Sequence, residues 1–283
     1  MARAEQVTEP EAWHGEGPCW HDDWGLAYVD MLRGDVLRLD AASGRVSRHH
    51  VGSVAAVVRP RRRGGAVVAV ERGFALIDPG TDPADARYLG DLWSDTSIRM
   101  NEGGCDPDGR FYCGTMAYDQ TPGAGIVYRL DPDGSTHTVL TGVTVSNGFG
   151  FSPDGGTAYY IDTPTQHVDA FDYSSRDGLT GRRHVIAVDG RPDGMTVDAE
   201  GHLWVALFGG GAVLRYRPDG TLEDRIELPV TQVTACALGG PDRRTLYITT
   251  SRQGVEEGTQ PEAGALFAAE VDVPGLPPLP YAG

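Results

Sequence analysis

The sequence predicts an all-β fold, a six-bladed β-propeller with a metal site at one mouth of its central channel, and assigns residues 1–283 to one domain. Three observations support this prediction. A short motif recurs about every 46 residues, turn-forming residues are abundant, and no segment shows a sustained apolar period of 3.6 residues. The 39 Gly and 19 Pro are scattered along the chain, which favours many short strands joined by tight turns.

The recurring motif is a turn followed by a short run rich in Tyr, Val, Trp and Ile, as expected of a strand. It is clearest in DPDGRFYCGTM from residue 106, SPDGGTAYYID from residue 152 and DAEGHLWVAL from residue 198. Counting weaker copies, the motif is anchored at His21, Pro60, Pro107, Pro153, Ala199 and Pro241. About 40 to 50 residues hold four strands and their turns, which is one propeller blade.

Six copies therefore predict six blades. A solenoid would need atypical end repeats, and a β-sandwich would not produce six near-equal repeats. We expect the strand that begins near Gly264 to bring the C-terminal region close to the N-terminal blade, and the final PPLPYAG to form a loose tail.

The composition excludes several classes of function. The formal net charge of −16 argues against nucleic acid as a partner, because the phosphates would be repelled. All 24 basic residues are Arg, so Schiff-base chemistry, a lysine-dependent phosphate loop and a Ser-Lys dyad are excluded. No run approaches the roughly 20 apolar residues of a membrane span, and MARAEQVTEPEAWHGEG does not resemble a signal peptide.

We therefore expect a cytoplasmic protein that contacts neither membrane nor nucleic acid, with a monomer as the default state. The four Cys residues show no CxxC spacing, which predicts buried, reduced thiols. The eight His residues show no HxH or HExxH spacing, which argues against a His-rich zinc site.

Acidic and amide residues recur at one position of the repeat. Six residues before the anchor lie Asn101, Asn147 and Asp193, and Glu16 lies five before His21. The second and sixth copies have Val54 and Ala235 there. The strand before the anchor turn should be the innermost of its blade, so these four oxygen-bearing side chains would converge at one channel mouth.

Carboxylate and amide oxygens suit Ca²⁺, Mg²⁺ or Mn²⁺ and tolerate Zn²⁺. By the same alignment of the repeats, Asp193 is a candidate catalytic residue, whereas Asp198 and Glu200 belong to a turn. Arg99 shares a strand face with Asn101 and should also face the channel, unless it pairs with Glu102 or Asp95.

Several stretches together resemble the SMP-30/gluconolactonase/LRE-like family over essentially the whole chain. They are EGPCW at 16–20, RMNEGGCDPDGRFYCGTM at 99–116, SNGFGFSPDGGTAYYIDT at 146–163, VDAFDY at 168–173, RPDGMTVDAEGHLWVA at 191–206 and GGPDRRTLYITTSRQG at 239–254, with the closing YAG. The resemblance implies a six-bladed propeller with one divalent cation, Ca²⁺ or Zn²⁺ first and Mg²⁺ or Mn²⁺ as alternatives, that hydrolyses sugar lactones.

The resemblance also implies individual roles. Glu16, Asn147 and Asp193 would be metal ligands, with Asp193 also the general base. Arg99 and Asn101 match positions that contact the sugar lactone. In the loop GTMAYDQTPGAG, Asp119 stands where the family has a Glu that contacts substrate, and the loop is shorter just beyond it. These differences bear on which substrate is bound.

The function expected from the sequence is therefore metal-dependent lactone hydrolysis, with the cation polarising the carbonyl and Asp193 activating water. Three alternatives remain. They are a phosphotriesterase-type hydrolase that uses the same metal site, a non-enzymatic calcium-binding regulatory protein, and an interaction propeller.

Overall fold

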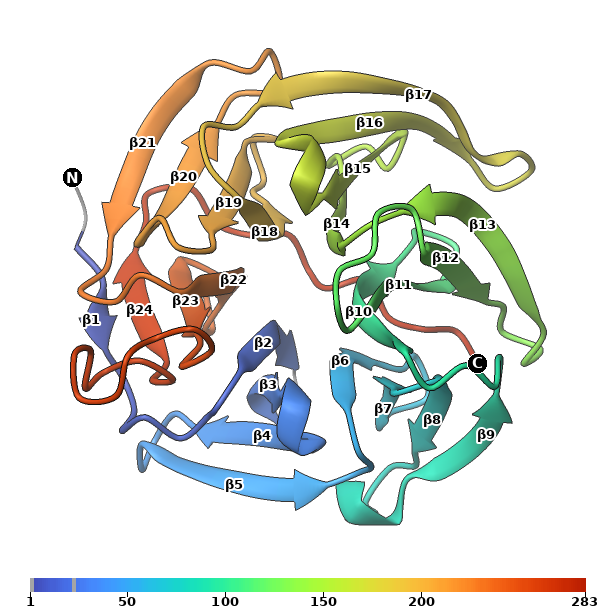
Figure 1. Ribbon diagram of the computed structural model, residues 1–283, viewed down its shortest axis with the longest axis horizontal. Helices are drawn as coiled ribbons and strands as arrows, with labels where there is room; N and C mark the ends of the chain where they lie inside the picture. The colour runs from blue at the N-terminus through green and yellow to red at the C-terminus, as the bar shows by residue number, and fades with distance from the viewer. Residues whose placement is uncertain (1–2, 22–23) are drawn as a thin grey trace.

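The computed structural model describes residues 3–21 and 24–283 and consists of six four-stranded antiparallel sheets arranged around a central channel (Figure 1). The prediction of a six-bladed propeller is confirmed. The described residues contain three short 3₁₀ turns, η1 (Met31–Arg33), η2 (Pro83–Asp85) and η3 (Thr163–Thr165), and no α-helix. In this part of the chain, no helix is long and apolar enough to cross a membrane.

Each of the first five blades is built from four consecutive strands, numbered from the channel outward. The first two blades contain β2 (Gly15–His21), β3 (Gly25–Asp30), β4 (Asp35–Asp40), β5 (Arg45–His50), β6 (Ala55–Pro60), β7 (Ala66–Val70), β8 (Gly73–Ile77) and β9 (Arg87–Asp91). The third and fourth contain β10 (Ile98–Cys105), β11 (Phe111–Ala117), β12 (Gly125–Leu130), β13 (Thr136–Val143), β14 (Ser146–Phe151), β15 (Thr157–Asp162), β16 (His167–Ser174) and β17 (Gly178–Ala187). The fifth contains β18 (Pro192–Val197), β19 (Leu203–Leu207), β20 (Ala212–Tyr216) and β21 (Leu222–Glu227).

The sixth blade is assembled from both ends of the chain. Its inner strands are β22 (Val233–Gly239) and β23 (Thr245–Thr250), followed by β24 (Phe267–Glu270) and, outermost, the N-terminal β1 (Glu5–Gln6). Glu5 pairs with Ala268 and Gln6 with Phe267. The expectation that the strand after Gly264 lies near the N-terminal segment is therefore correct, and this pairing closes the ring.

The anchor turns found in the sequence connect the first and second strands of the blades, so the strand before each anchor is the innermost one. Inner strands of adjacent blades contact one another all the way around, from β2 through β6, β10, β14, β18 and β22 back to β2. In the first copy the turn includes Asp22 and Asp23, which lie outside the described residues.

Every inner strand has a β-bulge at a similar height. In β10, Met100 pairs with Thr115 and Gly103 pairs with Cys113, so Asn101 and Glu102 together face a single residue of β11. Matching register shifts occur between Glu16 and Cys19, Ala55 and Val57, Ser146 and Phe149, Pro192 and Met195, and Val233 and Ala235. A bulge bends the strand and redirects side chains, here toward the channel.

The bulges also revise the repeat alignment at two blades. In the second and sixth blades the extra residue is Ala56 and Thr234, rather than the Val54 and Ala235 that the anchor spacing selected. In the first blade the bulge contains Gly17 and Pro18, and Glu16 is the paired residue just before it. Glu16 therefore lies one position earlier in its bulge than Asn101, Asn147 and Asp193 do in theirs, and the bulge does not account for its offset in the repeat.

The prediction of a loose C-terminal tail is wrong. The amide of Gly275 donates to Arg243 O at 2.7 Å, and that of Tyr281 donates to Pro60 O at 2.8 Å on the other side of the channel. The Tyr281 ring is buried, and its hydroxyl donates to Asp131 O at 2.8 Å. Residues 275–283 therefore form a strap across one end of the channel (Figure 1). Sequence reasoning failed here because a Pro-rich segment can be anchored by its neighbours while forming no regular structure itself.

The turn aspartate Asp198 has a structural role, as the sequence predicted. Its carboxylate is 0 % exposed and accepts hydrogen bonds from the amides of Glu200 at 3.0 Å and His202 at 2.9 Å. It also accepts from the Trp204 indole at 3.1 Å and from the Arg215 guanidinium at 2.7 Å. This one side chain ties the turn to the second and third strands of its blade.

We predict that Asp198→Ala lowers the free energy of unfolding by about 3 kcal/mol, because it leaves buried donors and the Arg215 guanidinium without their acceptor. Urea denaturation monitored by circular dichroism measures this change. Asp219→Ala, in an exposed Pro-Asp-Gly turn where Asp219 caps only Thr221, is the matched control and should change stability by less than about 0.5 kcal/mol. Equal losses in the two variants would contradict the structural role of Asp198.

Candidate active site at one end of the channel

The candidate residues lie near the N-terminal ends of the inner strands. Glu16, Asn101, Asn147 and Asp193 all lie at or within the bulges of β2, β10, β14 and β18, and all four are buried. The strap crosses the opposite end, where the same strands finish. We call the two ends of the channel the site end and the strap end.

A chain of hydrogen bonds connects three blades at the site end. The Arg99 guanidinium donates to Asn101 Oδ1 at 2.6 Å, and Asn101 Nδ2 donates to Asn147 Oδ1 at 2.8 Å. Asn147 Nδ2 in turn donates to Thr163 Oγ1 at 2.7 Å, and Thr163 donates to Pro192 O at 2.7 Å, next to Asp193. The chain fixes both amides, so Asn147 Oδ1 has a defined position.

Arg99 does not form the ion pair with Glu102 or Asp95 that the sequence left open. Glu102 pairs instead with Arg59 at 3.1 Å, and Asp95 caps Ser97. Besides Asn101, the Arg99 Nη1 group contacts Met31 Sδ at 3.0 Å, and Arg99 Nε is buried without a hydrogen-bond partner among the described residues. Burial lowers the pKa of Arg99, although the Glu16 and Asp193 carboxylates act in the opposite direction.

Glu16 and Asp193 are two buried carboxylates with few partners. They are 3 % and 6 % exposed. Within the described part of the chain, Glu16 Oε2 has no hydrogen-bond partner, and no side-chain hydrogen bond reaches the Asp193 carboxylate. Burial raises the pKa of both groups well above the ordinary value, and negative neighbours raise it further, Asp193 and Glu102 for Glu16 and Glu102 for Asp193.

His14 is a neighbour of Glu16 that the sequence reasoning overlooked. His14 Nε2 lies 3.6 Å from Glu16 Oε1, and Nδ1 hydrogen-bonds Ser251 Oγ at 2.7 Å. Burial and the nearby Arg99 charge lower the pKa of His14 to about 3, so the ring is neutral at pH 7. The neutral ring therefore lies beside Glu16, beyond hydrogen-bond distance, and supplies no countercharge.

Asp119 lies at the rim, in the exposed loop after β11, rather than among the buried residues. Its Oδ1 accepts from the Thr121 amide at 3.0 Å and the Thr121 hydroxyl at 2.7 Å, and these hydrogen bonds lower the pKa of the carboxyl. The preceding Tyr118 connects this loop to the site, since the Arg99 guanidinium lies 5.7 Å from the centre of its ring. The Tyr118 hydroxyl donates to Glu71 at 2.7 Å.

The donor set fits a divalent cation. A buried carboxylate oxygen without a partner and a second buried carboxylate nearby are costly unless a positive charge compensates them. Asn147 contributes an oriented amide oxygen. In the described ranges, no three His, Cys, Asp or Glu side chains are grouped so that they alone could hold a metal. A cation at this place therefore depends on the amide as well as on Glu16 and Asp193.

Four residues at the site were missed: His14, Met31, Tyr118 and Thr163. His14 could have been found, because it precedes Glu16 by two residues and so shares its strand face. Tyr118 adjoins Asp119 in the loop, which was a weaker signal. Met31 and Thr163 lie in the 3₁₀ turns η1 and η3 between second and third strands, and no repeat pattern marks them.

Comparison with known proteins identifies the family of this chain. A family model described as the SMP-30/gluconolactonase/LRE-like region matches residues 14–252. Regucalcin of Danio rerio is 37 % identical over 281 residues, covering 95 % of both chains. A pentonolactonase of Haloferax volcanii is 37 % identical over 285 residues, covering 96 % of both chains.

The fold also matches a solved structure closely. The crystal structure of a calcium-binding protein, regucalcin, from Agrobacterium tumefaciens superimposes with a TM-score of 0.91 at 29 % sequence identity. The match covers 99 % of this chain and 97 % of that chain.

We predict that Glu16→Gln raises the free energy of unfolding of the chelated protein at pH 8. Burial raises the pKa of Glu16 in the folded state, so its ionised form costs stability at a pH where the unfolded chain is fully ionised. Removing that charge should increase the free energy of unfolding by about 1 kcal/mol, which is close to the free energy that corresponds to a pKa shift of one unit. Glu257→Gln, which changes an exposed carboxylate, is the control for net charge and should have little effect. A clear loss of stability in Glu16→Gln alone would contradict the prediction.

Proposed function

Because this chain belongs to the SMP-30/gluconolactonase/LRE-like family, we propose that it is a metal-dependent hydrolase that opens sugar lactones. The main support for the proposal is the pair of buried carboxylates, Glu16 and Asp193. They have few hydrogen-bond partners and lie beside amides held by hydrogen bonds and a buried Arg. The relative from Haloferax volcanii is a pentonolactonase, which supports sugar lactones as the substrate class.

In this proposal Glu16, Asn147 and Asp193 hold one divalent cation. When bound, the cation supplies a Lewis acid for the lactone carbonyl. Asp193 accepts the proton of the attacking water, for which it needs one oxygen free of protein hydrogen bonds. His14 packs beside Glu16 with its Nε2 3.6 Å from Glu16 Oε1, and the Asn101–Asn147 hydrogen bond keeps the amide oxygen in position.

The remaining polar groups bind the sugar. The buried Arg99 Nε has an unused donor for a ring oxygen. Both N–H groups of Asn101 already donate within the protein, so Asn101 bonds a ring hydroxyl through its Oδ1 acceptor. Tyr118 is 46 % exposed at the rim and offers an aromatic face, and Asp119 follows it in the same loop. This polar entrance favours polyhydroxylated lactones over apolar phosphotriesters, which would leave the buried donors unpaired.

The first test is a pH-drop assay of chelated enzyme with Ca²⁺, Zn²⁺, Mn²⁺ or Mg²⁺ restored, on glucono-, galactono-, xylono- and arabinonolactone. Metal-dependent opening of at least one lactone is expected. Cleavage of a phosphotriester such as paraoxon without turnover of any lactone would favour the phosphotriesterase alternative. Metal binding without any turnover would favour a calcium-binding regulatory protein. Either result would overturn the proposal.

We predict that Asp193→Asn lowers kcat by at least about 10²-fold, because the amide cannot accept a proton from water. It should also reduce the rise in melting temperature that the restored metal produces, since one carboxylate ligand is lost. Differential scanning fluorimetry with and without metal gives this second readout independently of activity.

The matched control for that variant is Asp189→Asn, an exposed carboxylate just before β18. It should retain both the activity and the metal-induced stabilisation. Full turnover together with full metal-induced stabilisation in Asp193→Asn would remove Asp193 from both of its proposed roles.

We predict that Asp119→Ala raises the KM for polyhydroxylated lactones by about 10-fold, the effect of losing one hydrogen bond to a charged group, with kcat nearly unchanged. The fold should be unaffected because Asp119 is exposed. Asp133→Ala removes an identical carboxylate cap, on Ser135, in the turn between β12 and β13 and should leave the KM unchanged. An unchanged KM in Asp119→Ala would exclude the contact with substrate.

A further inference from the structure

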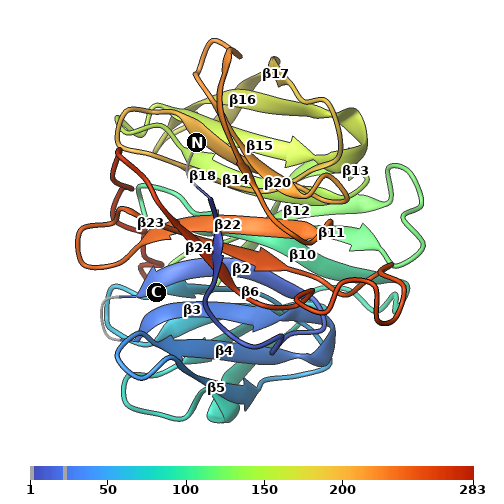
Figure 2. The ribbon, with the colours of Figure 1, turned by 90° about the vertical axis from the view of Figure 1, so that its left-hand side faces the viewer.

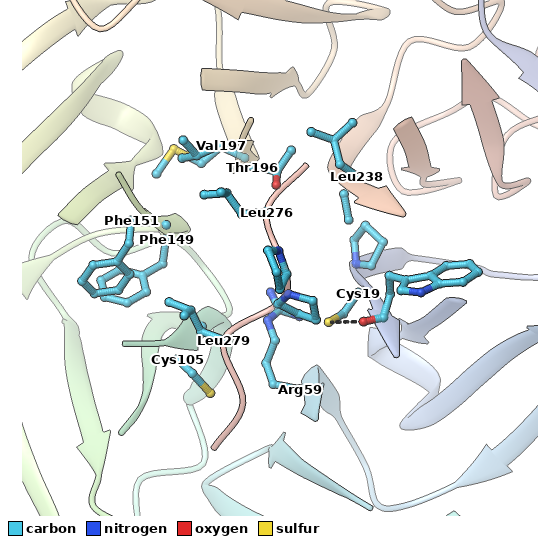
Figure 3. Close-up of a pocket in the computed structure, with 18 of the residues that line it drawn as sticks. Cys19, Arg59, Cys105, Phe149, Phe151, Thr196, Val197, Leu238, Leu276 and Leu279 are labelled. Atoms are coloured by element: carbon cyan, nitrogen blue, oxygen red, sulfur yellow. Dashed lines mark hydrogen bonds between the residues drawn. The ribbon is translucent and has the colours of Figure 1, made fainter. Parts of the chain in front are cut away.

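The strap end of the channel contains a cavity of about 520 Å³ that the proposed lactone site does not use (Figure 3). Its walls come from all six inner strands, and residues 276–280 of the strap cover it. Glu16, Asn147 and Asp193 do not line it. A volume of this size falls within the range of pockets that hold small organic molecules, roughly 300 to 1,000 Å³.

The lining is mainly apolar and aromatic. Phe149 and Phe151 project from one wall, and Trp20 and Leu238 lie on the side of the first and sixth blades. Leu276 and Leu279 of the strap lie against the same space (Figure 3). Aromatic walls of this kind favour a flat ring system with a large apolar surface.

The cavity wall also includes a buried carboxylate that is held in position by hydrogen bonds. Glu102 is 4 % exposed, and its Oε1 accepts from Arg59 Nη2 at 3.1 Å and from the Gly103 amide at 3.0 Å. Among the described residues no hydrogen bond is donated to Glu102 Oε2. Arg59 is held in turn by Gly17 O at 3.0 Å and Val58 O at 2.9 Å.

This ion pair determines the charge of a suitable ligand. Glu102 and Arg59 compensate each other, so a charged ligand would be desolvated without a countercharge. A neutral ligand with one O–H or N–H donor can bond Glu102 Oε2 at little cost.

The strap provides a route of entry. It is anchored on one side by the Gly275 amide on Arg243 O, and on the other by Tyr281 on Pro60 and by Ala282 on Gly109 O at 2.9 Å. Between these anchors, residues 276–280 form no backbone hydrogen bond with described residues, and three of the five are Pro. This stretch can move outward without breaking any sheet hydrogen bond.

We propose that this cavity is a second ligand-binding site, for a neutral two-ring aromatic molecule with a single hydroxyl donor, a naphthol-like phenol. Its rings occupy the space between the phenylalanines and the strap leucines, and its hydroxyl donates to Glu102 Oε2. The ligand enters from the strap end and contacts none of the three proposed metal ligands, Glu16, Asn147 and Asp193.

The test measures the binding of 2-naphthol to the full-length protein by isothermal titration calorimetry. 2-Methoxynaphthalene has the same rings and no donor, so it should bind at least about 10-fold more weakly. Binding should be equal with and without chelator, and an excess of xylonolactone should not displace 2-naphthol. Absence of 2-naphthol binding, equal affinity of the two naphthalenes, or displacement by the lactone would overturn the proposal.

Two variants locate the site. Thr196→Trp fills the cavity from β18 and should weaken 2-naphthol binding at least 10-fold, whereas Thr138→Trp, on an exposed position of β13, should not. Leu276 lies in the strap and in no β-strand, so Leu276→Asp tests the same cavity without disturbing sheet packing. This variant should also weaken 2-naphthol binding. Affinity equal to that of the unmodified protein in a folded Thr196→Trp or Leu276→Asp variant would place the ligand elsewhere.

Discussion

The bulge in each inner strand is the constraint on which the contents of the channel depend. In a regular strand, neighbouring residues point to opposite faces, and only every second residue could reach the channel. The bulge in β10 places Asn101 and Glu102 opposite one residue of β11, and both become buried polar groups of the channel. Asn147 and Asp193 occupy equivalent positions in β14 and β18. A polar site and a close-packed sheet can therefore coexist in the same strands.

The channel also concentrates charge in a place that water cannot screen well. Glu16, Asp193 and Glu102 are all buried, and burial raises the pKa of each. Only Glu102 has a full ion pair, with Arg59, whereas Arg99 bonds an amide, a backbone carbonyl and a thioether. The negative charge that remains without a partner is thus located at the site end. Under the two proposals made above, a cation and a polar substrate bind at the site end, and a neutral apolar molecule binds at the strap end.

Closure of the ring and closure of the channel use different segments. Pairing of the N-terminal β1 with β24 completes the sixth blade (Figure 2), and inner-strand contacts run through all six blades. The strap crosses from the fifth and sixth blades to the second and third. Since it ties strands far apart around the ring, it helps to hold the channel walls at a fixed distance from one another.

The sequence by itself determined the fold class, because a turn-and-strand motif at a spacing of 39 to 47 residues admits few architectures besides a propeller. It also distinguished Asp198, a turn residue with three kinds of hydrogen-bond donor around it, from Asp193 in the channel. Only the tertiary structure decided that Arg59 rather than Arg99 pairs with Glu102, that His14 and Tyr118 contact site residues, and that the final residues form a strap. These contacts join residues on different blades or at opposite ends of the chain, and a repeat pattern describes each blade without describing what faces it across the channel.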